Sequence, residues 1–459
     1  MDPVYIIRMK SCAISFVIFC CLSYMATARQ IAVASILANS GNRIMVQAPA
    51  ADEDIQPNFQ AALDKAVAGD EIVVPAGHYQ VMKTIVVNKP LFIHGAGMGK
   101  TILSRPEMLS DQTLSADTAN SMFVCSPGTG KGNLIISGLC LKSKYPSQNA
   151  SDRGSMASDI GIKLVKCMGF VVTHCRFENF GYAAVWVQHS DQAASGLISK
   201  NQFSHNVKGI DGLGLGYGVV VFGTNEQWVD DPQFGSDNFI FVEDNTFAIH
   251  RHAMAAGGCG RYVFRYNTVT DNYIGAHSGQ AIDAHEARQV KGMNYYSTRA
   301  VEIYNNKVIN TTFRDGSPII PGKSAKLLVE NAILIRGGEA LIHDNELQGY
   351  RFGIGIMNFM VKGTTAHYPL FTQIGYASAL VYGEKDKGMD SGHGAGDLFA
   401  WSNTFTPYAG ADSSTLLYNY QPAYYQLDRD YHLEAKPGYQ PYVYPHPLQK
   451  LAATMEGKE

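Results

Sequence analysis

Cationic and imidazole side chains are concentrated in one stretch of this sequence. From residue 251 to residue 300 there are six Lys or Arg residues and three acids, although the formal net charge of the whole chain is −3. Four histidines, at positions 250, 252, 277 and 285, lie in or beside the same stretch. A local excess of cations favours an anionic ligand, and an imidazole can take up a proton near neutral pH. These residues predict a site that holds an anion and moves a proton.

Such a site suits β-elimination on a uronate polymer, in which a cation neutralises the carboxylate and a base removes the neighbouring proton. We expect Arg265 or Arg261 to hold the carboxylate and Asp283 to orient an imidazole. The expected catalytic residues are His285, Asp283, His252 and His277. The expected substrate-binding residues are Arg265, Arg261, Arg251, Arg288 and Tyr304.

Glycoside hydrolysis is an alternative reaction, and it requires two carboxyl groups. Asp283 and Glu286 are three residues apart, so on a strand they would face opposite sides. The adjacent pair Asp230 and Asp231 is the other candidate. A further alternative is a non-catalytic surface or adhesion protein that binds glycan through exposed tyrosines and histidines.

A repeat in the sequence predicts the elements that position these residues. The pattern apolar-x-x-Asn-x-apolar recurs with asparagines at 201, 245, 267, 306, 345 and 403. Their separations of 44, 22, 39, 39 and 58 residues are close to multiples of about 20, the length of one solenoid repeat. Asparagine suits a recurring turn because it tolerates left-handed backbone and can bond to its copies in neighbouring repeats. Many short strands without intervening helices complete an all-β pattern.

Aligning the repeats by their asparagines predicts which side chains share a face. Val242, Phe264 and Ile303 fall at one interior position, and Ile282 fits the same column by spacing. Alternation along a strand then turns the next residue of each repeat outward. The predicted outward column contains Glu243, Arg265, Asp283 and Tyr304, with His285 on the same face as Asp283. The alternative without a ligand is that Glu243 and Arg265 form a surface ion pair and that the histidines cap turns.

Two features near the N-terminal end add to this pattern. Apolar residues at helical spacing predict one short helix near residues 57 to 67. The stretch HGAGMGKT, from His94 to Thr101, is not a phosphate-binding loop, because position 94 lacks the first glycine that the loop needs and no helix follows. We therefore expect a glycine-containing turn between two strands.

The helix, then VVPAGHY, then LFIHGAGMGKTIL, then the asparagine repeats resemble a right-handed parallel β-helix of the pectin-lyase-like superfamily. The resemblance covers roughly residues 52 to 445 and implies activity on a carbohydrate polymer. Lyases of this fold carry a lysine before a YRYN-type repeat and an RHG motif on the next one. This chain has MAAGGCGRYVFRYN and IDAHE instead, so their mechanism does not transfer residue by residue.

The ends of the chain are expected to lie outside the solenoid. Residues 1–28 are similar to a secretory signal peptide, with two basic residues, an apolar run and the site Ala-Thr-Ala. Residues 29–51 form a leader, 52–445 the β-helix domain and 446–459 a C-terminal tail. We expect secretion, a polysaccharide partner of anionic character, and no nucleic acid, nucleotide or membrane partner after cleavage. No metal site is predicted, although calcium is a possible cofactor, and the cysteines after the signal are buried thiols or form one or two disulfides.

Overall fold

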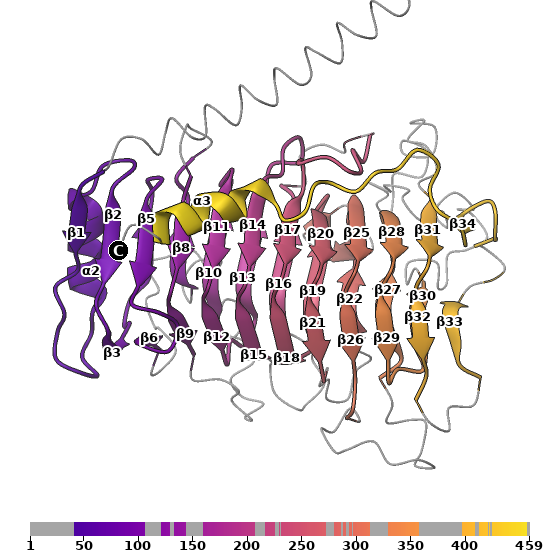
Figure 1. Cartoon of the computed structure of the whole chain (residues 1–459), viewed down its shortest axis with the longest axis horizontal. Helices are drawn as coiled ribbons and strands as arrows, with labels where there is room; N and C mark the ends of the chain where they lie inside the picture. Colours follow the sequence, from indigo (N-terminus) through magenta and orange to yellow (C-terminus); the bar gives the residue numbers. More distant parts are fainter. Residues whose placement is uncertain are drawn as a thin grey trace, which may run out of the picture.

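The strands of this protein form three parallel sheets around a common interior. The computed structural model describes residues 41–105, 121–128, 133–143, 159–206, 216–224, 229, 231–271, 280–285, 288–290, 293–295, 297–312, 329–357, 397–408, 413–420, 422 and 425–456. Successive strands pass from one sheet to the next, and each strand pairs in parallel with its counterparts in the neighbouring turns of the coil. The expected right-handed parallel β-helix is confirmed (Figure 1).

We name the three sheets A, B and C. Sheet A has 12 strands: β1 (Arg43–Met45), β2 (Glu71–Val74), β5 (Phe92–Gly95), β8 (Ile135–Ser137), β11 (Phe170–Thr173), β14 (Gly196–Ser199), β17 (Ile240–Glu243), β20 (Arg261–Arg265), β25 (Ala300–Tyr304), β28 (Glu339–His343), β31 (Leu398–Trp401) and β34 (Tyr431–His432). Sheet B has 10: β3 (Gly77–Gln80), β6 (Thr101–Ser104), β9 (Cys140–Lys142), β12 (Arg176–Glu178), β15 (Gln202–Asn206), β18 (Thr246–His250), β21 (Thr268–Thr270), β26 (Lys307–Ile309), β29 (Glu346–Gln348) and β32 (Thr404–Thr406).

Sheet C also has 10 strands: β4 (Ile85–Val87), β7 (Ser121–Cys125), β10 (Ile160–Val165), β13 (Ala183–Gln188), β16 (Tyr217–Phe222), β19 (His252–Gly257), β22 (Gln280–Ala284), β27 (Asn331–Ile335), β30 (Phe352–Ile356) and β33 (Thr415–Asn419). A separate antiparallel pair joins β23 (Arg288–Val290) and β24 (Met293–Tyr295), of which only the backbone is described. The helices are α2 (Gln56–Lys65) and α3 (Pro447–Glu456).

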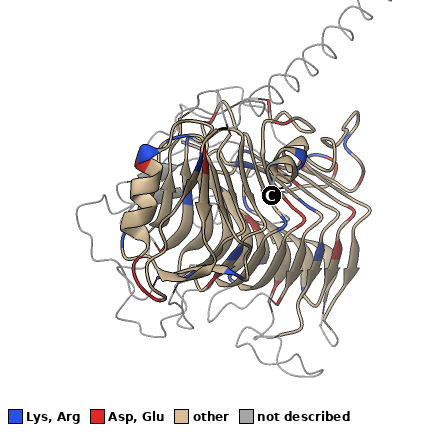
Figure 2. Ribbon diagram, turned by 60° about the vertical axis from the view of Figure 1, so that its left-hand side comes forward, with Lys and Arg blue, Asp and Glu red and all other residues tan. Residues whose placement is uncertain are grey.

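Inward-facing residues stack along the coil and form one continuous core. Phe177, Phe203 and Phe247 lie above one another with ring centroids 5.0 and 4.6 Å apart. The five described cysteines are all buried and free, so the expectation of thiols packed in the core is the one that holds. Charged residues are thinly spread over the coil (Figure 2), as burial of so many strand residues requires.

The asparagine repeat forms a hydrogen-bonded ladder between sheets A and B. Asn201, Asn245, Asn267, Asn306, Asn345 and Asn403 stack in order, each bonding through its backbone N–H and side-chain amide to the Oδ1 of the next. The left-handed conformation falls on the residue before each asparagine, for example Asp244 with φ 59° and Tyr266 with φ 55°. The ladder was predicted, but its asparagines are selected for these bonds and not for left-handed backbone.

The N-terminal end of the coil is closed by α2, which confirms the helix expected near residues 57 to 67. Phe59, Ala62 and Leu63 point into the core. The strand β1 lies within the expected leader and pairs with β2, so the solenoid begins before residue 52. The glycine-rich stretch is a turn between β5 and β6, as expected, and Gly95 is required there because a Cβ would lie 2.5 Å from the carbonyl oxygen of Gly138.

The chain after β34 returns along the outer face of sheet A. In Figure 1 this segment, in yellow, passes back over β31, β28, β25, β20 and β17, and α3 then lies across β14, β11 and β8. Contacts of α3 with β11 and β14 agree with that path. We call residues 433–456 the strap. Leu451 and Ala452 of the strap pack on an apolar outer face of sheet A that includes Val171, Leu197 and Phe241.

Among the described residues, neither helix has the length and hydropathy needed to cross a bilayer.

Candidate functional site

The predicted site residues divide between two faces of the coil. The register pairs Glu243, Arg265 and Tyr304 across β17, β20 and β25 of sheet A, which confirms that part of the outward column. Asp283 belongs to β22 of sheet C, where it pairs with Ala255 and Leu334. Placing Ile282, Asp283 and His285 in the same column as Arg265 was therefore wrong. The reason is that successive ladder asparagines lie in adjacent turns of the coil, so reading their separations as multiples of about 20 residues was wrong. Phe264 pairs directly with Ile303, which leaves no turn between them for Ile282.

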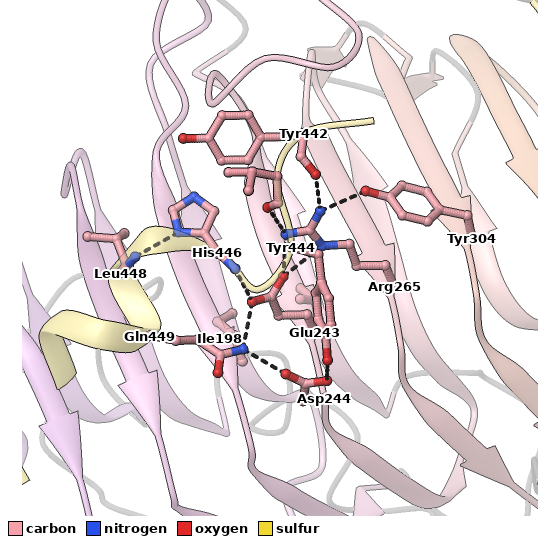
Figure 3. Close-up of polar contacts among 12 residues, drawn as sticks. Ile198, Glu243, Asp244, Arg265, Tyr304, Tyr442, Tyr444, His446, Leu448 and Gln449 are labelled. Atoms are coloured by element: carbon pink, nitrogen blue, oxygen red, sulfur yellow. Dashed lines mark hydrogen bonds and ion pairs between the residues drawn. The ribbon is translucent and has the colours of Figure 1, made fainter. Parts of the chain in front are cut away.

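The Arg265 column binds the strap. Arg265 is fully buried, forms an ion pair with Glu243 at 2.6 Å, and donates hydrogen bonds to the carbonyl oxygens of Tyr442 and Val443 at 2.6 and 2.9 Å (Figure 3). Glu243 in turn accepts hydrogen bonds from the backbone N–H of His446 and the side chain of Gln449, at 2.9 and 2.7 Å (Figure 3). The alternative of an ion pair is confirmed, but the pair is buried and holds backbone of the same chain.

Two other predicted substrate-binding residues on sheet A are also enclosed. The Tyr304 side chain is 1% exposed and its hydroxyl accepts a hydrogen bond from Arg265 at 2.8 Å. Arg261 is fully buried and donates to the carbonyl oxygen of Asp191 at 2.9 Å. Burial and the nearby guanidinium of Arg299 lower the pKa of Arg261 to about 10. Substrate binding by Arg265, Arg261 and Tyr304 has no support in this arrangement, because protein groups already surround them.

Sheet C brings four of the predicted residues together. These are Arg251, immediately before β19, His252 at its first position, Asp283 on β22 and His285 just after it. β19 and β22 are neighbouring strands, and their register sets Asp283 opposite Ala255. The His252 ring reaches toward Asp283, with Nε2 3.9 Å from Oδ2. Arg251 and His285 lie toward opposite ends of this strand pair. His252 and Asp283 are buried, whereas Arg251 and His285 are half-buried. This group is the candidate functional site.

Asp283 is held as a carboxylate by a residue that the sequence analysis did not select. Arg336, directly after β27, donates two hydrogen bonds to it, Nε to Oδ1 at 3.0 Å and Nη2 to Oδ2. Burial alone would raise the pKa of Asp283, but the charge and hydrogen bonds of Arg336 outweigh it and lower that pKa below its ordinary value. Asp283 therefore stays ionised and does not supply a proton.

His252 is a neutral imidazole with one nitrogen free. Its Nδ1 lies 2.6 Å from the carbonyl oxygen of Gln280 and must carry the proton, because a carbonyl only accepts. Nε2 is then an acceptor, lies 3.9 Å from Asp283 Oδ2, and has no hydrogen-bond partner in the described part of the chain. Burial, followed by the charge of Arg251, lowers the pKa of His252 well below its ordinary value. This is the arrangement of a general base with a carboxylate beside it.

Aromatic side chains adjoin the site. Arg251 Nη1 donates to the Tyr217 hydroxyl at 2.6 Å and its guanidinium lies over the Tyr217 ring, 5.5 Å from the centroid. The Tyr217 and His252 rings are 5.4 Å apart. Sequence analysis missed Tyr217 and Arg336, because both lie on sheet C, whereas the ladder asparagines mark the turn between sheets A and B. The sequence holds only local indications of these two residues. Tyr217 is the first residue of the strand Tyr217–Phe222, and Arg336 directly follows the strand Asn331–Ile335.

Some predictions fall outside the described residues. His277, Glu286 and Asp230 are among these, and the side chain of Arg288 is too. Asp231 is described and is exposed, with its Oδ1 accepting from the backbone N–H of Gln233 at 2.8 Å. Within the described ranges, no group of three or more His, Cys, Asp or Glu side chains is arranged to hold a metal ion.

Comparison with known proteins gives likeness of fold only. No protein-family model matches the chain, and no curated protein sequence matches it. The DFA-IIIase of Arthrobacter chlorophenolicus A6 is a similar solved structure, with 12% identity over 84% of this chain and 88% of that one and a TM-score of 0.47. The alginate lyase of Paenibacillus sp. str. FPU-7 has 12% identity over 86% and 98% and a TM-score of 0.36. ORF18 of Geobacillus virus E2 has 13% identity over 73% of this chain and a TM-score of 0.41. The match covers 60% of the length of that protein.

Proposed function

We propose that this protein binds an acidic polysaccharide on the outer face of sheet C and cleaves it by β-elimination, with His252 as the base. The observation that carries the proposal is the free Nε2 of a neutral His252, placed beside the ionised Asp283. A base needs a lone pair, and the protonated imidazole needs a nearby negative charge. Both are provided on neighbouring strands.

The remaining groups supply the other parts of the reaction. Arg251, which is half-buried and precedes His252 in the chain, faces the uronate carboxylate and balances its charge. The proton next to that carboxylate moves to Nε2 of His252, the C–O bond to the leaving sugar breaks, and a C=C bond forms. The Tyr217 hydroxyl accepts from Arg251 and so keeps its own proton for the leaving oxygen. Proton exchange between His252 and Tyr217 through water restores the starting state.

Hydrolysis is less well supported by the same residues. A hydrolase of this type needs a carboxylic acid that donates a proton. Asp283 is held ionised by Arg336. Glu330, directly before the neighbouring strand β27, accepts a hydrogen bond from the Tyr420 hydroxyl at 3.3 Å. The elimination proposal needs no second acid.

The proposal extends to location and cofactor. Export through the expected signal peptide would bring the protein to extracellular polysaccharide, and mass spectrometry of the exported protein should then show Arg29 at its N-terminus. Since Arg251 supplies the positive charge, we expect activity to persist when calcium is chelated. An exported protein that retains residues 1–28 would reject cleavage of the signal peptide. Loss of activity with a chelator, and its recovery with calcium, would reject a calcium-independent reaction.

The test measures the ultraviolet absorbance of the unsaturated uronate product and, separately, new reducing ends. Polygalacturonate, alginate and hyaluronan are compared with a neutral glucan. We expect absorbance to rise with at least one acidic polymer, and His252→Gln to lower kcat by roughly 100-fold or more, the usual contribution of a general base. His78→Gln, an exposed histidine on sheet B, is the matched control and should match wild type.

Three results would contradict the proposal. New reducing ends without absorbance would indicate hydrolysis, and binding without cleavage would indicate a glycan-binding protein. Full activity of His252→Gln would show that another group is the base.

A further inference from the structure

Aromatic side chains lie on both sides of the candidate site along sheet C. On the side toward the N-terminus lies the first aromatic patch. It consists of Tyr182, directly before β13, Trp186 on β13, and Phe222 on β16. On the other side, the second aromatic patch consists of Phe352, Tyr418 and Tyr420, from β30, β33 and the residue after β33. The charged groups of the candidate site lie between them, on β19, β22 and β27.

The first patch offers a half-buried indole with unused polar capacity. Trp186 packs against Phe222 with ring centroids 6.0 Å apart, and Lys163 Nζ lies 4.7 Å from the indole centroid. The Trp186 indole N–H is buried and has no hydrogen-bond partner in the described part of the chain. A buried N–H without an acceptor is costly, so a ligand with hydroxyl groups would satisfy it.

The second patch has a similar combination of ring and polar groups. Phe352 and Tyr418 are stacked at 3.9 Å, Tyr418 is 37% exposed, and Tyr420 meets Tyr418 edge to face at 4.6 Å. The Tyr420 hydroxyl exchanges hydrogen bonds with the Asn331 side chain at 3.0 and 3.3 Å. Aromatic rings with a polar edge suit a sugar, which presents apolar C–H faces and hydroxyl edges.

Spacing and charge decide the kind of ligand. From β13 to β33 there are six steps between neighbouring strands of sheet C, roughly 29 Å at about 4.8 Å a step. Along this path Arg251 and Arg336 balance the acids Asp283 and Glu330, and Lys163 on β10, the strand next to β13, adds a positive charge at one end. A protein partner would require a continuous apolar surface, but here the charged site separates the two patches. The face therefore suits a long anionic chain of sugars.

We propose that the two aromatic patches are sugar-binding subsites on opposite sides of His252, so that the protein takes an internal segment of an acidic polymer. Binding at both patches is independent of the reaction, whereas cleavage inside the polymer rests on the proposed function. A polymer held on both sides is cut away from its ends, and the early products are mixtures of many lengths.

The experiment measures binding by calorimetry with uronate oligomers of defined length and with the polymer, using His252→Gln to prevent turnover. Trp186→Ala and Tyr418→Ala are each expected to weaken binding of long oligomers by about 10-fold, which corresponds to about 1.4 kcal/mol. A short oligomer reaches only one patch, so only one of the two variants should weaken its binding. Trp186→Phe keeps an aromatic ring but removes the indole N–H, so it should weaken binding by less than Trp186→Ala does. It serves as the test if Trp186→Ala does not fold, and wild-type affinity in Trp186→Phe would then remove this subsite. Trp401→Phe, on sheet A, is the matched control and should be unchanged.

The outcomes separate this inference from the proposed function. Wild-type affinity in Trp186→Ala, or in Tyr418→Ala, removes the corresponding subsite and overturns two-sided binding. Cleavage with release of a single short product overturns the internal mode while leaving elimination intact. Binding that depends on both patches, without any cleavage, supports the subsites and rejects the proposed reaction.

Discussion

Arg265 illustrates how the neighbours of one residue decide its role. Its partners, Glu243 and two carbonyl oxygens of the strap, leave the guanidinium no free direction. Removing one member of a buried ion pair strands the other charge, which typically costs about 3–5 kcal/mol. We expect Arg265→Ala to lower the free energy of unfolding by that amount in chemical denaturation. Lys307→Ala, from a pair with Glu346 that is about half exposed, should change it by less than about 1 kcal/mol. Equal, small effects would show that the Arg265 pair adds no stability.

Asp283 gives a residue-scale prediction about pH. Its pKa in the folded protein lies below the unfolded value of about 3.9. The contribution of ionised Asp283 to the free energy of unfolding is therefore complete above its pKa in the unfolded chain. That contribution is lost as the pH falls through the pKa of Asp283 in the folded protein. We expect the difference in unfolding free energy between wild type and Asp283→Asn to be largest near neutral pH and to shrink below about pH 4. A difference that stays constant over this range would mean that Arg336 does not hold Asp283 ionised.

The asparagine ladder is the element that sets the register of the coil. Asn267 Nδ2 donates to Val242 O, Arg265 O and Asn306 Oδ1, and its own Oδ1 accepts from Asn245. Asn267→Ala leaves several buried groups without partners, at about 1–3 kcal/mol each. Asn403, half-buried at the end of the ladder, has no further asparagine to bond. Asn403→Ala should therefore destabilise less in the same denaturation experiment, and equal losses would mean that stacking contributes little.

The ladder also explains how far sequence could predict this molecule. Wherever a repeat has its asparagine, the register came out correctly, as for Val242, Phe264 and Ile303. Ile282 lies on the sheet C strand of the turn that already carries Asn267, and the loops that join the strands differ in length, so spacing alone placed Asp283 on the wrong sheet. The grouping of His252 with Asp283 depended on that assignment. Arg336 was beyond reach because it comes from a strand about 50 residues later, and only the coil brings it near.

At the scale of the whole molecule, the strap divides the outer surface into a covered face and a face available for ligand. Sheet A would otherwise expose Val171, Leu197 and Phe241, and a patch of that kind favours association. Sheet C has its aromatic and charged residues outside the strap. The strap therefore closes the outer face of sheet A, and the function that we propose is on sheet C, which the strap leaves uncovered.

The last prediction tests whether the strap is a cover or part of the coil. Leu451 is 5% exposed on the apolar face of sheet A, and burying a leucine stabilises by about 1.5–3 kcal/mol. Leu451→Asp should release α3, so that amide hydrogen exchange becomes fast in residues 447–456 and a dye that binds apolar surface fluoresces. The amides of the ladder should stay protected, because their bonds lie within the coil. Lys450→Asp changes charge at an exposed neighbour and should leave α3 protected. Loss of protection throughout the coil in Leu451→Asp would instead make the strap part of one cooperative unit with the solenoid.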